Sequence, residues 1–305
     1  MLKQVTNNKL GIILILLSFA AFPVSNSATR YILHSSEIPL SMYFSYVKFF
    51  AVAILLVFGL IAFGKIFFSI QNKKIVFVRC IILMINNICL TIALSYLALD
   101  IFYSIVFIMP LMTTIMGVLI LKERFTLWNM MAIIIGFLGI LVVIQPNITN
   151  SLKIIGVVCT IVAAITGSLS GIIARKYLAG ENPYSATFYV AICSFILGII
   201  MIISEGNINF AVQEYLSLKV SIIIFLSALF TIVASSLYMK AYQISNVTII
   251  APAQYTQLIW GILLGYLIFN DKTTETTLLG CGIIIFATLF NYYISKRGRN
   301  EVITK

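Results

Sequence analysis

The chain has 305 residues, of which 61% are hydrophobic and 10% are charged, and its mean hydropathy is +1.10. A soluble domain holds roughly half apolar residues and about a quarter charged ones, so this composition excludes a compact water-soluble fold. The formal net charge of +11 would favour nucleic-acid binding in a soluble protein, but here the basic residues stand at the ends of apolar stretches, and we expect no nucleic-acid partner.

Ten apolar stretches have the length of a membrane-crossing helix. A helix needs roughly 20 residues to cross a bilayer, whereas a barrel strand needs about 10 and alternates in polarity. The stretches are Leu10–Thr29, Leu40–Phe63, Val76–Tyr96, Ile101–Leu121, Leu127–Ile144, Ile154–Ala174, Tyr184–Ile203, Val220–Tyr238, Val247–Phe269 and Thr277–Ile294. We therefore predict an all-α membrane protein with ten transmembrane helices in the lipid bilayer of the cell inner membrane.

The N-terminal stretch follows Lys3 and Lys9, as the apolar part of a signal peptide would. Its apolar run is longer than the roughly 7–15 residues of such a peptide, so we expect it to be retained as a helix.

The basic residues predict the orientation of these helices. With the N-terminus in the cytoplasm, the outer connections carry only Arg30, Lys153, Lys219 and Lys272, and all other basic residues except Lys48 fall on the cytoplasmic side. Lysine and arginine accumulate on the cytoplasmic side of membrane proteins. We therefore expect both termini in the cytoplasm.

The sequence contains an internal repeat. The segment Gly11–Arg30 matches Gly156–Arg175, with equal separation between the glycine and the arginine. Because each half holds five predicted helices, the second half enters the membrane in the opposite orientation. We therefore predict two inverted five-helix repeats, residues 1–147 and 148–305, a plan that recurs in secondary transporters.

Charged residues inside membrane helices are expensive and mark functional sites by default. All nine acidic residues lie in predicted loops or at span ends. Lys48 lies inside the second span, where it either contacts an anionic group of a solute or extends toward the interface. Arg79 and Lys240 lie near span ends, and we expect them to reach the cytoplasmic surface with their long side chains.

Uncharged polar residues deep in the spans form a second group of candidates. Asn26 lies near the outer end of the first span, Asn86 and Asn87 lie inside the third, and Tyr103 lies in the fourth. These side chains need hydrogen-bond partners, which either a wet cavity or a neighbouring helix supplies.

The ninth span has the densest polar cluster. Gln254, Tyr255, Gln257 and Trp260 fall within two helical turns, and Pro252 beside them predicts a kink. Hydrogen-bonding and stacking groups in this arrangement suit an organic solute with a polar head and a flat part. The alternative is that they join helices and anchor the interface, which is the commoner role of any one such residue.

Motifs for catalysis and metal binding are missing from the sequence. It has five cysteines, all within apolar stretches and without a CxxC pair, and one histidine, His34. It also lacks GxSxG, HExxH and Walker sequences. We expect no metal, no cofactor and no enzymatic activity, but a small-molecule substrate.

Two segments carry a resemblance to a known family. LILKERFTLWNMMAIIIGFLGILVVIQP (residues 119–146) and AYQISNVTIIAPAQYTQLIWGILLGYLIFND (residues 241–271) resemble the repeat endings of the EamA-type drug/metabolite transporter superfamily. Glu123 and Asp271 fill the place of the family's acidic residue after a long span, and Lys48 stands where the family often has arginine. The resemblance implies ten helices in two inverted repeats around a central cavity, and transport of a metabolite.

We expect a secondary carrier that moves a small organic metabolite, such as an amino acid or an amino-acid or nucleoside derivative, by alternating access. Lys48 would attract a carboxylate, Asn86 and Asn87 would hydrogen-bond the solute, and Tyr255 and Trp260 would stack on it. The alternatives are a broad-specificity efflux pump and a non-transporting sensor or assembly subunit. The sequence leaves open whether the chain is a monomer or a homodimer.

Overall fold

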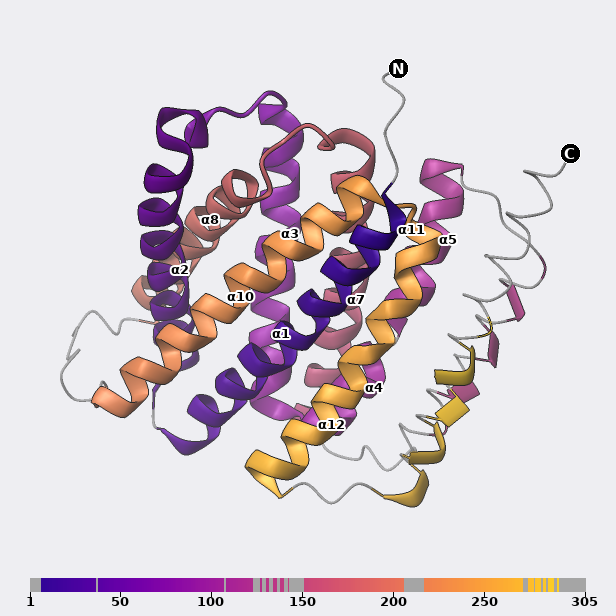
Figure 1. Cartoon of the computed structure of the whole chain (residues 1–305). Coiled ribbons are helices and arrows are strands. Elements are labelled where there is room, and N and C mark those ends of the chain that lie inside the picture. Colours follow the sequence, from indigo (N-terminus) through magenta and orange to yellow (C-terminus); the bar gives the residue numbers. More distant parts are fainter. Residues whose placement is uncertain are drawn as a thin grey trace, which may run out of the picture.

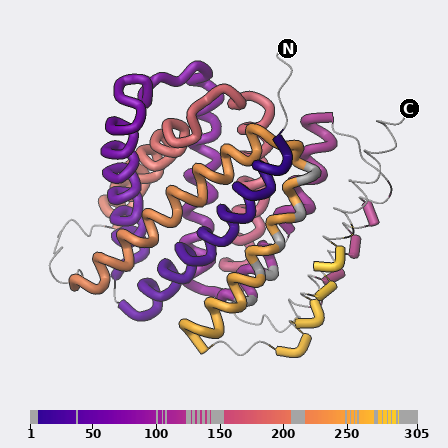
Figure 2. The backbone as a smooth tube through the Cα atoms, viewed as in Figure 1, coloured from indigo at the N-terminus to yellow at the C-terminus, as the bar shows by residue number. Residues whose placement is uncertain are grey.

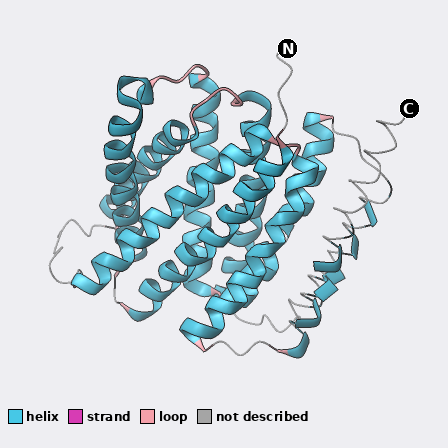
Figure 3. Ribbon diagram, in the orientation of Figure 1, coloured by secondary structure: helices cyan, strands magenta, loops and turns pink. Residues whose placement is uncertain are grey.

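The structure, a computed structural model, is a bundle of tilted helices in which no strand occurs among the described residues (Figures 1 and 3). It describes residues 7–36, 38–106, 108–122, 151–205 and 217–270, together with separate residues between 127 and 142 and between 274 and 290.

The described helices follow the apolar stretches of the sequence closely. They are α1 (Asn8–Ser35), α2 (Leu40–Phe63), η1 (Gly64–Phe68), α3 (Lys73–Tyr96), α4 (Leu99–Val106), α5 (Ile108–Leu121), α7 (Ser151–Tyr177), α8 (Pro183–Ser204), α10 (Leu218–Ile244), α11 (Val247–Ile250), η2 (Ala251–Tyr255) and α12 (Thr256–Phe269). Seven helical segments within the described ranges are long and apolar enough to cross a membrane. The all-helical class is thus confirmed. The count of ten stays a prediction, because the spans expected at Leu127–Ile144 and Thr277–Ile294 lie largely outside the described residues.

The expected span Val247–Phe269 is not one regular helix. It divides into α11, the 3-10 turn η2 and α12, and Pro252 lies in the first turn of η2. Proline has no N–H to donate to the preceding turn, which explains why regular α-helical hydrogen bonding stops here. The kink expected at Pro252 is thus a 3-10 turn that divides the span into two α-helical segments.

The outer surface of the bundle is apolar. Ile61, Leu119 and Leu267 are 82%, 72% and 65% exposed. Large apolar side chains at such exposure are unfavourable in water, but they match the hydrocarbon of a bilayer, where the backbone is satisfied inside each helix. The described surface thus agrees with the composition in placing the chain in a membrane.

Two helix pairs form the centre of the bundle. The tube in Figure 2 shows α1 running beside α10 in the opposite direction, and α3 packs in the same antiparallel manner on α7. Helices α10 and α7 run parallel. The Tyr238 hydroxyl donates to the carbonyl of Gly167, and Gln243, further along α10, donates to the carbonyl of Leu178, directly after the end of α7. The first helices of the two sequence halves, α1 and α7, consequently point in opposite directions.

Each of the two helix pairs contains a hydrogen bond at an equivalent position of the repeat. The sequence repeat aligns Ser18 of α1 with Ala163 of α7. The Ser18 hydroxyl donates to the backbone carbonyl of Ala234 on α10 over 2.8 Å, and the Asn86 amide of α3 donates to the carbonyl of Ala163 over 2.6 Å. Each bond satisfies a polar side chain inside the bilayer by joining a helix of one half to a helix of the other.

Candidate functional site

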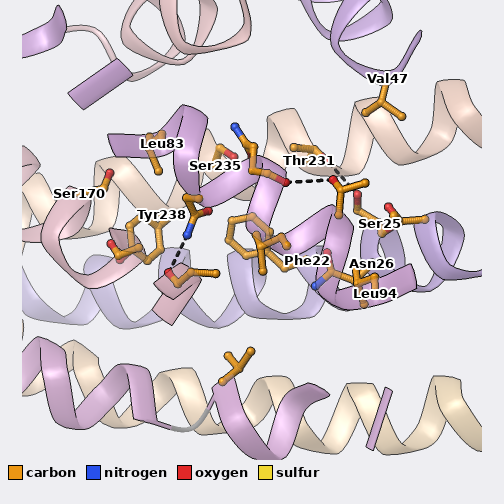
Figure 4. A pocket seen from close by; sticks show the side chains of 18 of the residues that line it. Phe22, Ser25, Asn26, Val47, Leu83, Leu94, Ser170, Thr231, Ser235 and Tyr238 are labelled. Carbon is orange, nitrogen blue, oxygen red and sulfur yellow. Dashed lines mark hydrogen bonds between the residues drawn. The ribbon is translucent and has the colours of Figure 1, made fainter. Parts of the chain in front are cut away.

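A cavity lies inside the bundle, and both halves of the chain line it. Its walls come from α1, α2, α3, α4, α5, α7, α8 and α10, with one residue from α12, and it holds about 1220 Å³ of space between protein atoms, counting the part that opens to solvent. Figure 4 shows Ser170 and Tyr238 toward one end of this cavity and Ser25, Asn26 and Thr231 toward the other.

Five of the residues singled out in the sequence line this cavity. They are Asn26, Lys48, Asn86, Asn87 and Gln257. They come from α1, α2, α3 and α12, so elements far apart in the chain bring them to one space. Whether each of them touches a solute stays a prediction.

Three others, among the described side chains, do not line the cavity, and the fourth lies outside the described side chains. Tyr103 is fully buried behind Asn26, whose amide donates to its hydroxyl over 2.9 Å. Gln254 is also buried, and its amide donates to the hydroxyl of Tyr242 over 2.6 Å. Trp260 is 41% exposed on the outer surface, away from the expected stacking position. Tyr255 lies in η2, and its side chain is outside the described part of the chain.

The two neighbouring asparagines of α3 are anchored through their nitrogens. The Asn86 Nδ2 atom donates to the carbonyl of Ala163 and to the hydroxyl of Thr166, while Asn87 Nδ2 donates to the hydroxyl of Ser194 over 3.2 Å. Each amide oxygen still has acceptor capacity, since the hydrogen bonds recorded for these two side chains use only the nitrogen. Their carbonyl oxygens can therefore accept from an amine or hydroxyl group of a solute.

Lys48 lies on the cavity wall formed by α2. Its side chain is 7% exposed, and its Nζ atom lies 5.4 Å from the centre of the Phe44 ring. Within the described ranges, the ammonium has no carboxylate partner in ion-pair contact. A cation in such a place is available to an anionic group that enters the cavity.

Arg79 was not expected at this site. The sequence suggested that it reaches the cytoplasmic surface, but the side chain is only 2% exposed and lines the cavity. Its Nε atom donates to the hydroxyl of Ser170 over 3.1 Å, whereas Nη1 is buried without a hydrogen-bond partner. The expectation is wrong because Arg79 lies on the face of α3 that packs on α7, where its side chain contacts Ser170.

A network of hydroxyl groups lines the opposite end of the cavity. The Tyr43 hydroxyl donates to Thr29 over 2.7 Å and lies 3.2 Å from the hydroxyl of Ser227. Ser25 lies within hydrogen-bond distance of both Ser227 and Thr231, at 3.1 Å and 2.7 Å. These neutral groups satisfy one another inside the protein.

The two ends occupy related positions in the repeat. Ser25 of α1 aligns with Ser170 of α7, so the Ser25–Ser227 contact between α1 and α10 corresponds to the Ser170–Arg79 contact between α7 and α3. The same correspondence holds for the Ser18–Ala234 and Asn86–Ala163 hydrogen bonds, which join the same two helix pairs. Arg79 is thus a charged residue at a position where the other half carries a serine.

Aromatic rings form part of the remaining wall. Phe19 and Phe22 of α1 meet the ring of Tyr238 edge to face, with centroids 6.0 Å and 6.4 Å apart, and all three line the cavity. Aromatic faces attract cations and stack on flat rings. The cavity therefore combines apolar surface with a few polar groups, as small-molecule sites do.

The electrostatics of the cavity are one-sided. Lys48 and Arg79 line it, and no aspartate or glutamate occurs among its described lining residues. No cluster of histidine, cysteine, aspartate or glutamate able to hold a metal ion occurs among the residues that the structure describes. The arrangement is suited to binding an organic anion or a zwitterion.

Comparisons with known proteins show which family the chain resembles. A family model described as the EamA-like transporter family matches residues 9–145 and again residues 154–293. The S-adenosylmethionine uptake transporter of Rickettsia prowazekii (strain Madrid E) is 26% identical over 298 residues, with 95% of each chain covered. That of Rickettsia bellii (strain RML369-C) is 27% identical over 303 residues, covering 96% of this chain and 97% of the relative. A riboflavin transporter of Vibrio cholerae is 21% identical over 201 residues, 63% of this chain and 62% of the relative.

The fold also matches a solved structure. One crystal structure superposes with a TM-score of 0.72 at 13% sequence identity, covering 95% of this chain and 98% of the other. Such a low identity shows the shared fold alone. The double match of the family model over nearly the whole chain shows more: this chain belongs to the EamA-like transporter family, a family of membrane transporters and not of enzymes.

Proposed function

We propose that the protein is a secondary carrier of the cell inner membrane that moves a small zwitterionic or anionic metabolite by alternating access. The observation that carries this proposal is the cavity between the two halves, with Lys48, Arg79 and uncharged polar groups on its wall and no acidic residue among those described there. A buried cation without a counter-ion is unfavourable unless a ligand supplies the opposite charge.

The substrate class follows from matching groups. A carboxylate would bind Lys48, an amine would donate to the amide oxygens of Asn86 and Asn87, and a flat ring would stack on the aromatic wall. S-adenosylmethionine has all three groups and a sulfonium cation that suits an aromatic face. Because two relatives are named as transporters of that compound, it is the first solute to test among amino-acid and nucleoside derivatives.

The conformational change would be a rocking of two inverted repeats, residues 1–147 and 148–305, about the cavity between them. The opposite directions of α1 and α7 and the equivalent Ser18–Ala234 and Asn86–Ala163 contacts support this division. In the proposed orientation both termini lie in the cytoplasm, and ten helices cross the bilayer. Single-cysteine labelling from either side of the membrane tests the orientation.

The transport proposal can be tested with the purified full-length chain in proteoliposomes. We expect saturable uptake of one labelled solute from a panel of S-adenosylmethionine, riboflavin and free amino acids. Many weak substrates without saturation would favour a broad-specificity efflux pump instead. No transport of any solute, together with a stoichiometric protein partner, would favour a sensor or assembly subunit.

A matched pair of variants ties the activity to the cavity. Lys48→Gln removes a positive charge from the cavity wall, and Lys176→Gln removes one from the exposed end of α7. We expect only the first to lower the affinity for the transported solute. Equal kinetics in the two variants would contradict the assignment of Lys48.

A further inference from the structure

Arg79 is a charged side chain on the cavity wall whose hydrogen-bonding capacity is only partly used. One nitrogen, Nε, donates to Ser170, and Nη1 is buried without a partner. A guanidinium has five donors in a planar fork that fits carboxylate and phosphate groups. The side chain therefore presents buried donors to a cavity whose described wall provides no acidic residue to receive them.

We propose that Arg79, held in place by Ser170, forms a second anion-binding subsite, which takes a carboxylate or phosphate group of the transported solute. This inference rests on the proposed carrier function, and it assigns a binding role to a residue that the sequence had placed at the membrane surface. Ser170 acts as a positioning residue, because its hydroxyl receives Nε and leaves the other guanidinium nitrogens for the ligand.

Packing between helices does not explain the arginine. The repeat places Ser25 where Ser170 stands, and the α1–α10 contact there is completed by Ser227, a small neutral residue. The same helix–helix contact therefore forms without a charge in the other half. Burying an arginine at this point is unfavourable without a counter-ion, so a structural role alone would favour a neutral residue.

The subsite is separate from Lys48 in depth. Lys48 stands fifteen residues before the end of α2 at Phe63, and Arg79 stands six residues after the start of α3 at Lys73. The end of α2 is connected to the start of α3 through η1 and residues 69–72, and the two helices run in opposite directions (Figure 1). At about 1.5 Å per residue, their levels differ by about 13 Å along the helix axes. The two cations on the cavity wall therefore lie at different depths.

The test measures anion binding without requiring a known substrate. The full-length chain is purified in detergent, and its thermal unfolding is followed while acetate or inorganic phosphate replaces chloride at constant ionic strength. We expect a saturable increase in Tm with one of these anions, and an apparent affinity at least about tenfold weaker in Arg79→Gln than in the wild type, which corresponds to about 1.4 kcal/mol. Acetate as the better ligand indicates a carboxylate subsite, and phosphate indicates a phosphate subsite.

Three further variants keep the test decisive if Arg79→Gln folds poorly. Arg79→Lys keeps the charge without the fork, so we expect intermediate affinity, whereas Lys176→Gln removes an exposed charge and should leave the affinity unchanged. Ser170→Ala should weaken anion binding by about threefold, since a lost neutral hydrogen bond is worth about 0.5–1.5 kcal/mol. Equal anion affinity in the wild type, Arg79→Gln and Arg79→Lys overturns the subsite.

The outcome is separable from that of the carrier proposal. If proteoliposomes transport a solute but Arg79→Lys and Arg79→Gln leave both its KM and the anion affinity unchanged, the subsite fails and the carrier stands. If the wild type binds anions through Arg79 but moves no solute, the subsite stands and the carrier proposal fails.

Discussion

The two ends of the cavity are built on equivalent contacts but differ in chemistry. At one end, Ser25, Ser227, Thr231, Thr29 and Tyr43 donate to and accept from one another, and all are neutral. At the other end, the corresponding contact joins a serine to a buried guanidinium with an unpartnered nitrogen. The inverted repeat therefore places similar helix–helix contacts at both ends of the cavity, and a different residue at one of these contacts makes the cavity asymmetric.

This difference between the two ends indicates which residues contribute mainly to stability and which contribute mainly to ligand binding. A polar network whose members satisfy one another contributes to stability and leaves little for a ligand. A buried charge whose donors are left open lowers stability, and it gains most when a ligand binds. We therefore expect substitutions at the neutral end to change unfolding and substitutions at the charged end to change transport.

The largest effect is expected for Arg79→Met. Loss of hydrogen bonds to a charged group should lower kcat/KM for an anionic solute by about 30-fold, or about 2 kcal/mol. The same substitution should raise Tm, because it removes an uncompensated buried charge. Uptake kinetics and thermal unfolding, measured on the same preparation, check the expected fall in kcat/KM and the expected rise in Tm. A fall in Tm together with unchanged kcat/KM would assign Arg79 to the scaffold.

Lys48→Ala should have the next largest effect. Loss of the ammonium should raise KM for an anionic solute by about tenfold, as expected for one charge-assisted contact. Lys48→Arg preserves the charge and should retain more of the affinity. Uptake of a carboxylated solute and of its decarboxylated analogue measures the effect, and an equal loss for both compounds would show that Lys48 does not bind the carboxylate.

Tyr43→Phe tests the neutral end. The substitution removes a hydroxyl that donates to Thr29 and lies beside Ser227, and we expect it to destabilise the fold by about 1 kcal/mol. KM should stay within about twofold of the wild type, since no ligand contact is lost. Tyr177→Phe, at a residue that is 45% exposed, is the matched control. A change in KM without a change in unfolding would reverse the assignment of this end.

The smallest effect is expected for Trp260→Ala. Trp260 lies on the outer surface, while Gln257 on the same helix lines the cavity. Kinetics of Trp260→Ala should equal those of the wild type, and Gln257→Ala should raise KM by about threefold through a lost hydrogen bond. The pair marks the boundary of the cavity on α12. A stronger effect at Trp260 would restore the stacking role that the sequence suggested.

Much of the fold could be predicted because lipid imposes simple rules on the sequence. The expected span Leu40–Phe63 coincides with α2, and the repeat that begins at Gly11 and Gly156 corresponds to antiparallel α1 and α7. Hydropathy reports the length of an apolar segment well. It reports helix continuity poorly, which is why the interruption at η2 was expected only as a kink at Pro252.

The site was less predictable because it depends on which face of each helix points inward. Gln257 and Trp260 are three residues apart, and at 3.6 residues per turn their directions differ by about 60°, enough to separate cavity from lipid. Arg79 was misplaced because its position near the start of the span does not reveal that its side chain faces Ser170 on α7. The sequence could not show that Nη1 of Arg79 lacks a hydrogen-bond partner, because this depends on neighbouring residues that are distant in the chain.

The positive cavity also has a consequence for the return step of the cycle. A carrier that delivers its cargo must close again while empty, and this would enclose Lys48 and Arg79 with no carboxylate among the described cavity residues to offset them. Enclosing unpaired ions costs several kcal/mol each, so closure should be faster with an anion on board. We therefore expect counterflow: vesicles preloaded with unlabelled solute should take up label about tenfold faster than empty ones, a difference that should shrink in Arg79→Met. Equal rates in both kinds of vesicle would show that the empty protein returns freely.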